Sequence, residues 1–258
     1  GLGHYKINDI NSYNNYIFAA TDSGIYRTSD NGNSWQQFNN GLSNLNVKSI
    51  ASIGNKLFAG TSSGLYVTTN NGVTWNSSGY NTYNFGFVKV IDNKIFIGGD
   101  SNASLYVSLD QGLTWSPIGL SITNADINDI AIKNGVYFAG TSLTGLYKSI
   151  DSGVTWQQVN NGILGTYITS IISDNNILLT SAFSIGPVIQ YNGVFKYDSI
   201  NNNWTSYNNG LLNLGVKLSL ISYGLVDAIS NKIYTTSINS LITEDANFNQ
   251  NDINIFPN

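Results

Sequence analysis

The chain has 258 residues, and its 11 Lys and Arg against 15 Asp and Glu give a formal net charge of −4. The absence of Cys excludes disulfides and thiol nucleophiles, and a single His excludes a metal site with two imidazole ligands. An acidic chain argues against a nucleic-acid partner, and no apolar run approaches the roughly 20 residues of a membrane helix. We expect no cofactor and no bound metal.

Tryptophans recur along the chain at a nearly constant interval. They stand at positions 35, 75, 115, 156 and 204. A period of about 40 residues predicts a solenoid, a propeller or a repeat array.

Four of the five tryptophans end the same kind of octapeptide. The copies are Thr28-Ser-Asp-Asn-Gly-Asn-Ser-Trp35, Thr68-Thr-Asn-Asn-Gly-Val-Thr-Trp75, Ser108-Leu-Asp-Gln-Gly-Leu-Thr-Trp115 and Ser149-Ile-Asp-Ser-Gly-Val-Thr-Trp156. A fifth copy at 197–204 has diverged but keeps Trp204, and residues 243–248 resemble a sixth with Phe248 in the Trp place.

The sequence before each octapeptide also repeats. Lys56-Leu-Phe-Ala-Gly-Thr61 matches Val136-Tyr-Phe-Ala-Gly-Thr141, and Asn, Gly and Ser punctuate the runs between. Short alternating runs bounded by turn residues predict strands. In the second repeat we expect strands at residues 47–53, 56–61, 64–69 and 74–78.

Six such units in 258 residues predict an all-β chain. Units of about 43 residues with four strands are typical of β-propeller blades. We expect one domain at 1–250 with blades beginning near residues 5, 44, 83, 124, 165 and 212, an insertion around 182–191 in the fifth and a divergent sixth. Five blades with an irregular tail are the alternative; an open solenoid would need capped edges.

The octapeptides resemble the Asp box, or BNR repeat, of propeller blades in sialidases, xyloglucanases, sortilin-type receptors and the photosystem II assembly factor. The acidic position of the motif is held by Asp30, Asn70, Asp110 and Asp151, and its glycine position by Gly32, Gly72, Gly112 and Gly153. Its tryptophan position is held by Trp35, Trp75, Trp115, Trp156 and, in the divergent copy, Trp204. We expect a structural role: the acidic side chain accepts turn amides, Gly allows the turn, and Trp packs between blades. One carboxylate per loop supplies too few ligands for a calcium ion.

The resemblance includes enzymes, whose sites can be compared with this chain. A sialidase-like site needs three arginines, and Arg27 is the only Arg, so that activity is excluded. A xyloglucanase-like site needs two carboxylates across a cleft, and acidic residues outside the boxes leave it open: Asp9, Asp92, Asp100, Asp126, Asp129, Asp174 and Asp227. The basic patch of the photosystem factor has no counterpart among dispersed basic residues.

The end of the chain carries a second resemblance. Asn251-Asp-Ile-Asn-Ile-Phe-Pro-Asn258 is similar to the opening of the type IX secretion sorting domain of Bacteroidetes. The resemblance implies secretion or display on the outer-membrane surface of a Gram-negative bacterium. A last strand at 253–256 closed by Pro257 is the competing interpretation of the segment 251–258.

Ligand contacts are expected where first strands line a propeller channel. Alignment of these strands places Asp9 and Asp129 in one register, preceded by Asn8 and Asn128, and Tyr83 and Tyr191 are aromatics outside the repeat pattern. The competing interpretation is that the polar groups satisfy neighbouring backbone and that the aromatics pack between blades.

The sequence therefore predicts a secreted or cell-surface binding or adhesion module without catalytic activity. Its partner would be a glycan or a protein, with no membrane span. The alternatives are an extracellular glycoside hydrolase with an Asp pair and a purely structural unit of a surface assembly.

Overall fold

The computed structural model describes most of the chain as strands and turns. It covers residues 2, 5–80, 84–100, 105–119, 122, 125–173, 177–184, 190–207, 217–221, 224–229 and 232–236, with the backbone alone at 100, 190–192 and from 217 onward. Within these ranges there is no helix long and apolar enough to cross a membrane. The chain divides into two compact units, residues 1–127 and 128–258, and each is described by itself.

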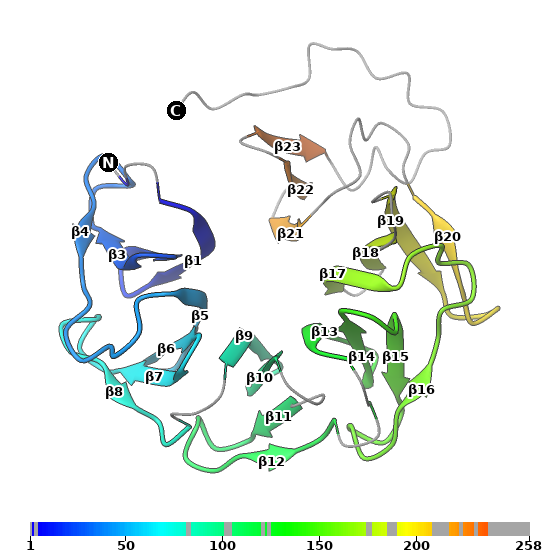
Figure 1. Cartoon of the computed structure of the whole chain (residues 1–258), viewed down its shortest axis with the longest axis horizontal. Coiled ribbons are helices and arrows are strands. Elements are labelled where there is room, and N and C mark those ends of the chain that lie inside the picture. Colours follow the sequence, from blue (N-terminus) through cyan, green and yellow to red (C-terminus); the bar gives the residue numbers. More distant parts are fainter. Residues whose placement is uncertain are drawn as a thin grey trace. The chain divides into compact units, whose positions relative to one another are not determined.

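The first unit contains three four-stranded antiparallel sheets in which strand order follows chain order (Figure 1). The first sheet is β1 (Ile7–Tyr13), β2 (Tyr16–Thr21), β3 (Gly24–Thr28) and β4 (Gln36–Gln37). The second is β5 (Val47–Ile53), β6 (Lys56–Thr61), β7 (Gly64–Thr68) and β8 (Asn76–Ser77). The third is β9 (Asn84–Ile91), β10 (Lys94–Asp100), β11 (Leu105–Ser108) and β12 (Ser116–Pro117).

The second unit repeats this plan. One sheet is β13 (Ile127–Lys133), β14 (Val136–Thr141), β15 (Leu146–Ser149) and β16 (Gln157–Gln158). The next is β17 (Tyr167–Ser173), β18 (Leu178–Ser184), β19 (Gln190–Asp198) and β20 (Asn203–Ser206). The last has three described strands, β21 (Lys217–Ile221), β22 (Gly224–Ile229) and β23 (Lys232–Thr236).

The all-β prediction and the four-stranded repeat are confirmed by the five four-stranded sheets. In the second repeat, β5 and β6 have the predicted bounds, whereas β8 is shorter than the predicted 74–78. The number of blades stays a prediction, because the expected sixth box at 243–248 and the segment 251–258 lie outside the described residues.

Two-residue turns with left-handed backbone join the first two strands of several sheets. Asn14 and Asn15 have φ angles of 49° and 64°, and Asp92 and Asn93 have 49° and 60°. Positive φ at both central positions is the requirement of the type I′ turn, whose twist matches antiparallel strands. Asn and Asp tolerate this conformation best among residues with a side chain, which accounts for the Asn and Asp at these turns.

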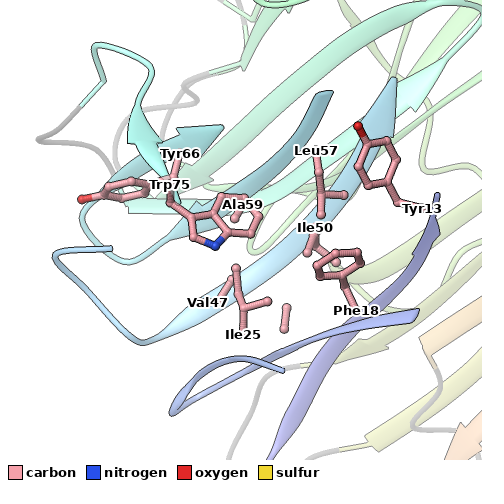
Figure 2. Packing of buried hydrophobic residues seen from close by; sticks show 10 residues of the cluster. Tyr13, Phe18, Ile25, Val47, Ile50, Leu57, Ala59, Tyr66 and Trp75 are labelled. Carbon is pink, nitrogen blue, oxygen red and sulfur yellow. The ribbon is translucent and has the colours of Figure 1, made fainter. Parts of the chain in front are cut away.

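The hydrophobic cores lie between consecutive sheets rather than within one sheet. In the first unit, Phe18 and Ile25 of the first sheet pack with Ile50, Leu57 and Trp75 of the second (Figure 2). Burial of each large aliphatic or aromatic side chain stabilises the fold by roughly 1.5–3 kcal/mol. A sheet therefore depends on its neighbour for burial of its face.

The second unit contains an equivalent core. Phe138 and Leu146 of one sheet pack with Ile168, Phe195 and Trp204 of the next. We call the packed surface between two consecutive sheets a seam.

Candidate functional site

The first strands of three sheets, β1, β5 and β17, carry a β-bulge at the same place. In β1, Ile7 pairs with Thr21 and Asp9 with Ala20, so Asn8 is an extra residue. The register of β5 skips Lys48 in the same way, and that of β17 skips Thr169. A bulged residue leaves the ladder and turns its side chain away from the regular alternation. The bulged Asn8 contacts the next sheet, whereas the bulged Thr169 hydroxyl bonds Ser181 of its own sheet.

Asp9 uses its carboxylate to join two sheets of the first unit. Oδ1 accepts the backbone N–H of Ile10 at 2.9 Å, and Oδ2 accepts the backbone N–H of Ile50 at 2.9 Å. The Ser49 hydroxyl lies 2.8 Å from the same Oδ2. The adjacent Asn8 donates from Nδ2 to the Val47 carbonyl at 2.7 Å. The pair therefore connects β1 to β5 across the seam.

The second unit contains the same arrangement. Oδ1 of Asp129 accepts the N–H of Ile130 at 2.8 Å, and Oδ2 accepts the N–H of Ile171 at 2.7 Å. Asn128 donates to the Ile168 carbonyl at 2.8 Å. Both pairs lie within the identical tetrapeptide Ile-Asn-Asp-Ile, at residues 7–10 and 127–130. This local sequence therefore builds the same link between sheets twice.

These contacts bear on the residues expected to touch a ligand. Asp9, Asn8, Asp129 and Asn128 each engage backbone of the next sheet, so ligand contact by them stays a prediction beside this structural role. Tyr83 lies outside the described residues, and only the backbone of Tyr191 is described, paired opposite Phe183 in β18.

Replacement of Asp9 by alanine is expected to destabilise the first unit by about 2–4 kcal/mol, since two amides lose their acceptor and the Ile50 amide is buried. Asp9→Asn keeps one carbonyl oxygen and should lose about half as much. Urea unfolding without any ligand measures the effect. Asp22→Ala is the control, because the exposed Asp22 carboxylate contacts only its neighbour Ser23 among the bonds described. Equal stability of the two alanine variants would contradict the structural role.

The Asp boxes are closed networks of short hydrogen bonds. The Thr28 hydroxyl donates to Asp30 Oδ1 at 2.6 Å, and the Ser34 backbone N–H and hydroxyl donate to Asp30 at 2.9 and 2.6 Å. The Gly32 N–H donates to Thr28 Oγ1 at 3.0 Å. Asp110 and Asp151 repeat this pattern. The acidic side chain thus holds its own turn.

The box glycines adopt the backbone that the network requires. Gly32, Gly72, Gly112 and Gly153 have φ between 81° and 92°, a region that side chains disfavour. Asn70 replaces the acid in the second box: its Oδ1 accepts the Thr74 N–H at 3.0 Å and its Nδ2 donates to the Thr74 hydroxyl at 2.9 Å. An amide can therefore hold the same turn without charge.

The diverged fifth box has moved its acid by one position. Asp198 accepts the N–H groups of Ile200 and Asn201 at 2.9 and 3.3 Å and the Asn201 side chain at 2.6 Å. This residue was missed in the sequence because the acid precedes its usual place in the octapeptide. The turn is still held by one carboxylate, although the repeat pattern is lost.

Hydrogen bonds to the carboxylates lower their pKa values. The Ser34 and Thr28 hydroxyls hold the pKa of Asp30 at about 2, and the Thr155 hydroxyl and amide do so for Asp151. The Thr114 hydroxyl lowers the pKa of Asp110 further still. The box carboxylates are therefore ionised throughout the neutral range and bound to their own turns.

The depressed pKa values predict an acid-dependent stability. The unfolded chain has Asp pKa values near 3.9, so the box contribution is complete above about pH 4 and is lost as pH falls toward 2, through the folded pKa. Urea unfolding between pH 5 and pH 2 should show this loss, and the variant with Asp30→Asn and Asp151→Asn should show a flatter profile. An unchanged profile would assign the acid dependence to other groups.

The box tryptophans fall into different environments. Trp75 and Trp204 are each 2% exposed and donate Nε1 to a carbonyl of the preceding sheet's last loop, Phe38 and Val159 respectively, at 2.9 Å. Trp35 and Trp156 donate instead to the glycine of their own box. Trp115 Nε1 is buried without an acceptor among the residues described. Among the described hydrogen bonds, the indole Nε1 groups of Trp75 and Trp204 are the ones that cross a seam.

Basic side chains also bind the box turn of the next sheet. Arg27 stacks between the rings of Tyr16 and Phe38, 4.1 and 3.7 Å from their centroids, and donates to the Asn71 carbonyl at 2.6 Å. Lys56 donates to the Gln111 carbonyl at 2.9 Å. The one Arg of the chain therefore lies at the box turns and is committed to packing.

Titratable groups do not gather into a metal site in the described part of the chain. No group of three or more His, Asp or Glu side chains there is placed to hold a metal ion. The described boxes each use a single acidic or amide side chain for hydrogen bonds within the turn.

Comparisons with known proteins agree with this architecture. Residues 106–117, which contain the third box, match the BNR/Asp-box repeat family. A comparison with curated proteins gives no match.

Solved structures show similarity over nearly the whole chain. An ancestral GH74 enzyme is 18% identical with a TM-score of 0.69, covering 91% of this chain and 37% of the enzyme. The extracellular domain of a putative one-component system from B. thetaiotaomicron is 16% identical with a TM-score of 0.67, covering 90% and 31%. YCF48 bound to D1 peptide is 14% identical with a TM-score of 0.65, covering 90% and 78%.

The chain thus spans about a third of the length of the first two structures. At these identities the likeness concerns the fold alone. Together with the repeated four-stranded antiparallel sheets, it defines an all-β protein with a fold of the β-propeller type.

Proposed function

We propose that the chain is a secreted or cell-surface β-propeller of six blades that binds a glycan or a protein without catalysing a reaction. The observation that carries the proposal is the use of its carboxylates. Asp9 and Asp129 hold neighbouring sheets together, and Asp30, Asp110 and Asp151 hold box turns. Carboxylates whose oxygens are occupied by hydrogen bonds within the fold are poorly placed to exchange a proton with a substrate.

One of the similar solved structures supports an extracellular role, and another supports a peptide partner. One neighbour is the extracellular domain of a putative one-component system, another is a GH74 enzyme, and a third holds a peptide. The resemblance of residues 251–258 to a type IX sorting segment supports display on the outer membrane or release from a Gram-negative bacterium. Both features favour a partner outside the cell.

The likeness to a GH74 enzyme favours one alternative, an extracellular glycoside hydrolase. Hydrolysis would need two carboxyl groups facing each other across a sugar. Asp92 and Asp126 are described side chains outside the boxes and outside the links between sheets, and they are the first candidates for such a pair.

The test uses the full chain on a glycan array, with size-exclusion chromatography and a polysaccharide hydrolysis assay beside it. The proposal expects saturable binding to a defined glycan or protein and no release of sugar. Hydrolysis that disappears in Asp126→Asn or Asp92→Asn would replace the proposal by the enzyme alternative. Discrete self-assembly without any ligand would favour the structural unit.

A further inference from the structure

The second unit contains a cavity of about 290 Å³ at a seam. It lies between the sheet of β13–β16 and the sheet of β17–β20. Its lining consists of Lys133, Asn134, Val136, Phe138, Lys148, Ile150, Tyr197 and Ser199. This volume lies just below the roughly 300–1,000 Å³ typical of ligand pockets, so it suits one residue or a small group.

The corresponding place in the first unit is occupied by protein. Repeat alignment matches Val136 with Tyr16 and Lys148 with Arg27. There the Arg27 guanidinium lies against the Tyr16 ring, 4.1 Å from its centroid, and reaches the next box turn. Val136 offers no ring for such a stack. The smaller side chain at Val136 therefore accounts for a hollow at this seam.

The cavity has a positive rim in an acidic chain. Lys133 and Lys148 are two of the 11 basic residues of a chain with net charge −4. Lys148 Nζ and the Tyr197 hydroxyl both donate to Asn202 Oδ1, at 2.5 and 2.6 Å, which holds them at the wall. An ammonium has three donors, and this bond uses one. The nearby Asp198 carboxylate is bound within its own turn.

The walls of the cavity and the surface beside it are apolar. Val136, Phe138 and Tyr197 contribute aliphatic and aromatic surface to the lining. Ile150, which also lines it, is 80% exposed, and Ile200 in the next box turn is 92% exposed. Large aliphatic side chains so exposed beside a cavity favour contact with an apolar partner. The site therefore combines apolar surface with two ammonium groups.

We propose that this cavity binds the C-terminal residue of a polypeptide whose last side chain is large and apolar. In an extended segment, consecutive side chains point to opposite sides, so an acidic residue and its apolar neighbour cannot enter one small cavity together. At a C-terminal residue the carboxylate and the side chain leave the same Cα. The side chain packs on Val136 and Phe138 while the carboxylate meets the Lys133 and Lys148 ammonium groups.

This inference rests on the proposed binding function and selects a peptide partner for one surface. The test uses the full chain and the peptide acetyl-Gly-Ser-Gly-Leu with a free C-terminal carboxylate, titrated by calorimetry at low ionic strength. Two matched peptides carry a C-terminal amide or glycine in the last place. Loss of a charge-assisted bond should weaken binding roughly tenfold to a hundredfold for the amide, and the glycine peptide should also bind weakly.

Variants of the chain locate the site. Val136→Tyr restores the ring present in the first unit and should abolish binding, and Lys148→Gln should weaken it about tenfold. Lys56→Gln is the matched control, because Lys56 also binds a box-turn carbonyl but lies in the first unit. It should leave binding unchanged. Circular dichroism and the melting temperature check that each variant is folded.

Several results would overturn the inference. Equal binding of the acid and the amide removes the role of the lysines, and unchanged binding by folded Val136→Tyr places the peptide elsewhere. Binding of glucuronate, but not of the peptide, would make the occupant a sugar acid. A glycan or protein ligand whose binding survives Val136→Tyr leaves the proposed function standing and rejects this cavity as its site.

Discussion

Replacement of Gly162 by alanine is expected to destabilise the second unit by about 4 kcal/mol, because two unfavourable effects combine. Gly162 has a φ of 89°, where a side chain costs roughly 1–2 kcal/mol. A Cβ at this position would also overlap the backbone carbonyl oxygen of Trp204 in the next sheet. Because the Trp204 N–H is bound to the Asn161 carbonyl at 2.8 Å, the two segments cannot separate without breaking that bond.

Gly135→Ala separates the two effects. Gly135 has a φ of 77° in the same unit, but a Cβ there has no atom within 4 Å. Its replacement should cost only about 1 kcal/mol, from backbone strain alone. Urea unfolding followed by tryptophan fluorescence measures both variants. Similar losses for Gly135→Ala and Gly162→Ala would mean that the close approach to Trp204 adds nothing.

Trp204→Ala is expected to cost about 3–5 kcal/mol, the range for removal of a large buried aromatic side chain. Trp204 packs edge-on to Phe138 with ring centroids 6.4 Å apart, and it lies 5.0 Å from Tyr197. Its loss would leave a cavity in the core and the Val159 carbonyl without its donor. Trp204→Phe keeps most of the packing and should cost about 1–2 kcal/mol.

Trp156→Ala is the matched control within the same unit. Its indole is only partly buried, and its Nε1 donates to Gly153 of its own box rather than to another sheet. We expect a loss of about 1 kcal/mol, the centre of the distribution for single substitutions. Thermal unfolding measures the two variants side by side. If Trp156→Ala destabilises the chain as much as Trp204→Ala does, the contact across the seam is not what distinguishes them.

Local features of the fold could be predicted well from the sequence. Asn, Gly and Ser mark the turns by their own backbone preferences, so β5 and β6 have the expected bounds. The last strand of the repeat was predicted too long for a reason that involves distant residues. The Thr74 N–H is bound to Asn70 Oδ1 and the Trp75 N–H to the Asn40 carbonyl, so neither joins the ladder of β8.

Contacts between sheets could not be predicted from the repeat pattern. Nothing near Asp9 in the sequence indicates that its Oδ2 meets the Ile50 amide, about 40 residues away. The five box tryptophans look alike in sequence, yet among the described indole Nε1 bonds those of Trp75 and Trp204 reach the preceding sheet, whereas those of Trp35 and Trp156 stay within their own box. The cavity beside Lys148 was also missed in the sequence. It depends on the small size of the Val136 side chain, which stands where the first repeat has Tyr16.

The links made by Asn8 with Asp9, and by Asn128 with Asp129, run forward along the chain, each from one sheet to the next. Two repeats bring such an Asn-Asp pair, and the repeat that follows each of them supplies the backbone groups that the pair binds. A duplication that copies such a repeat together with the one that follows it would carry the hydrogen bonds of the link with it. The identical tetrapeptides at residues 7–10 and 127–130 fit growth by duplication, in which no new contact had to evolve.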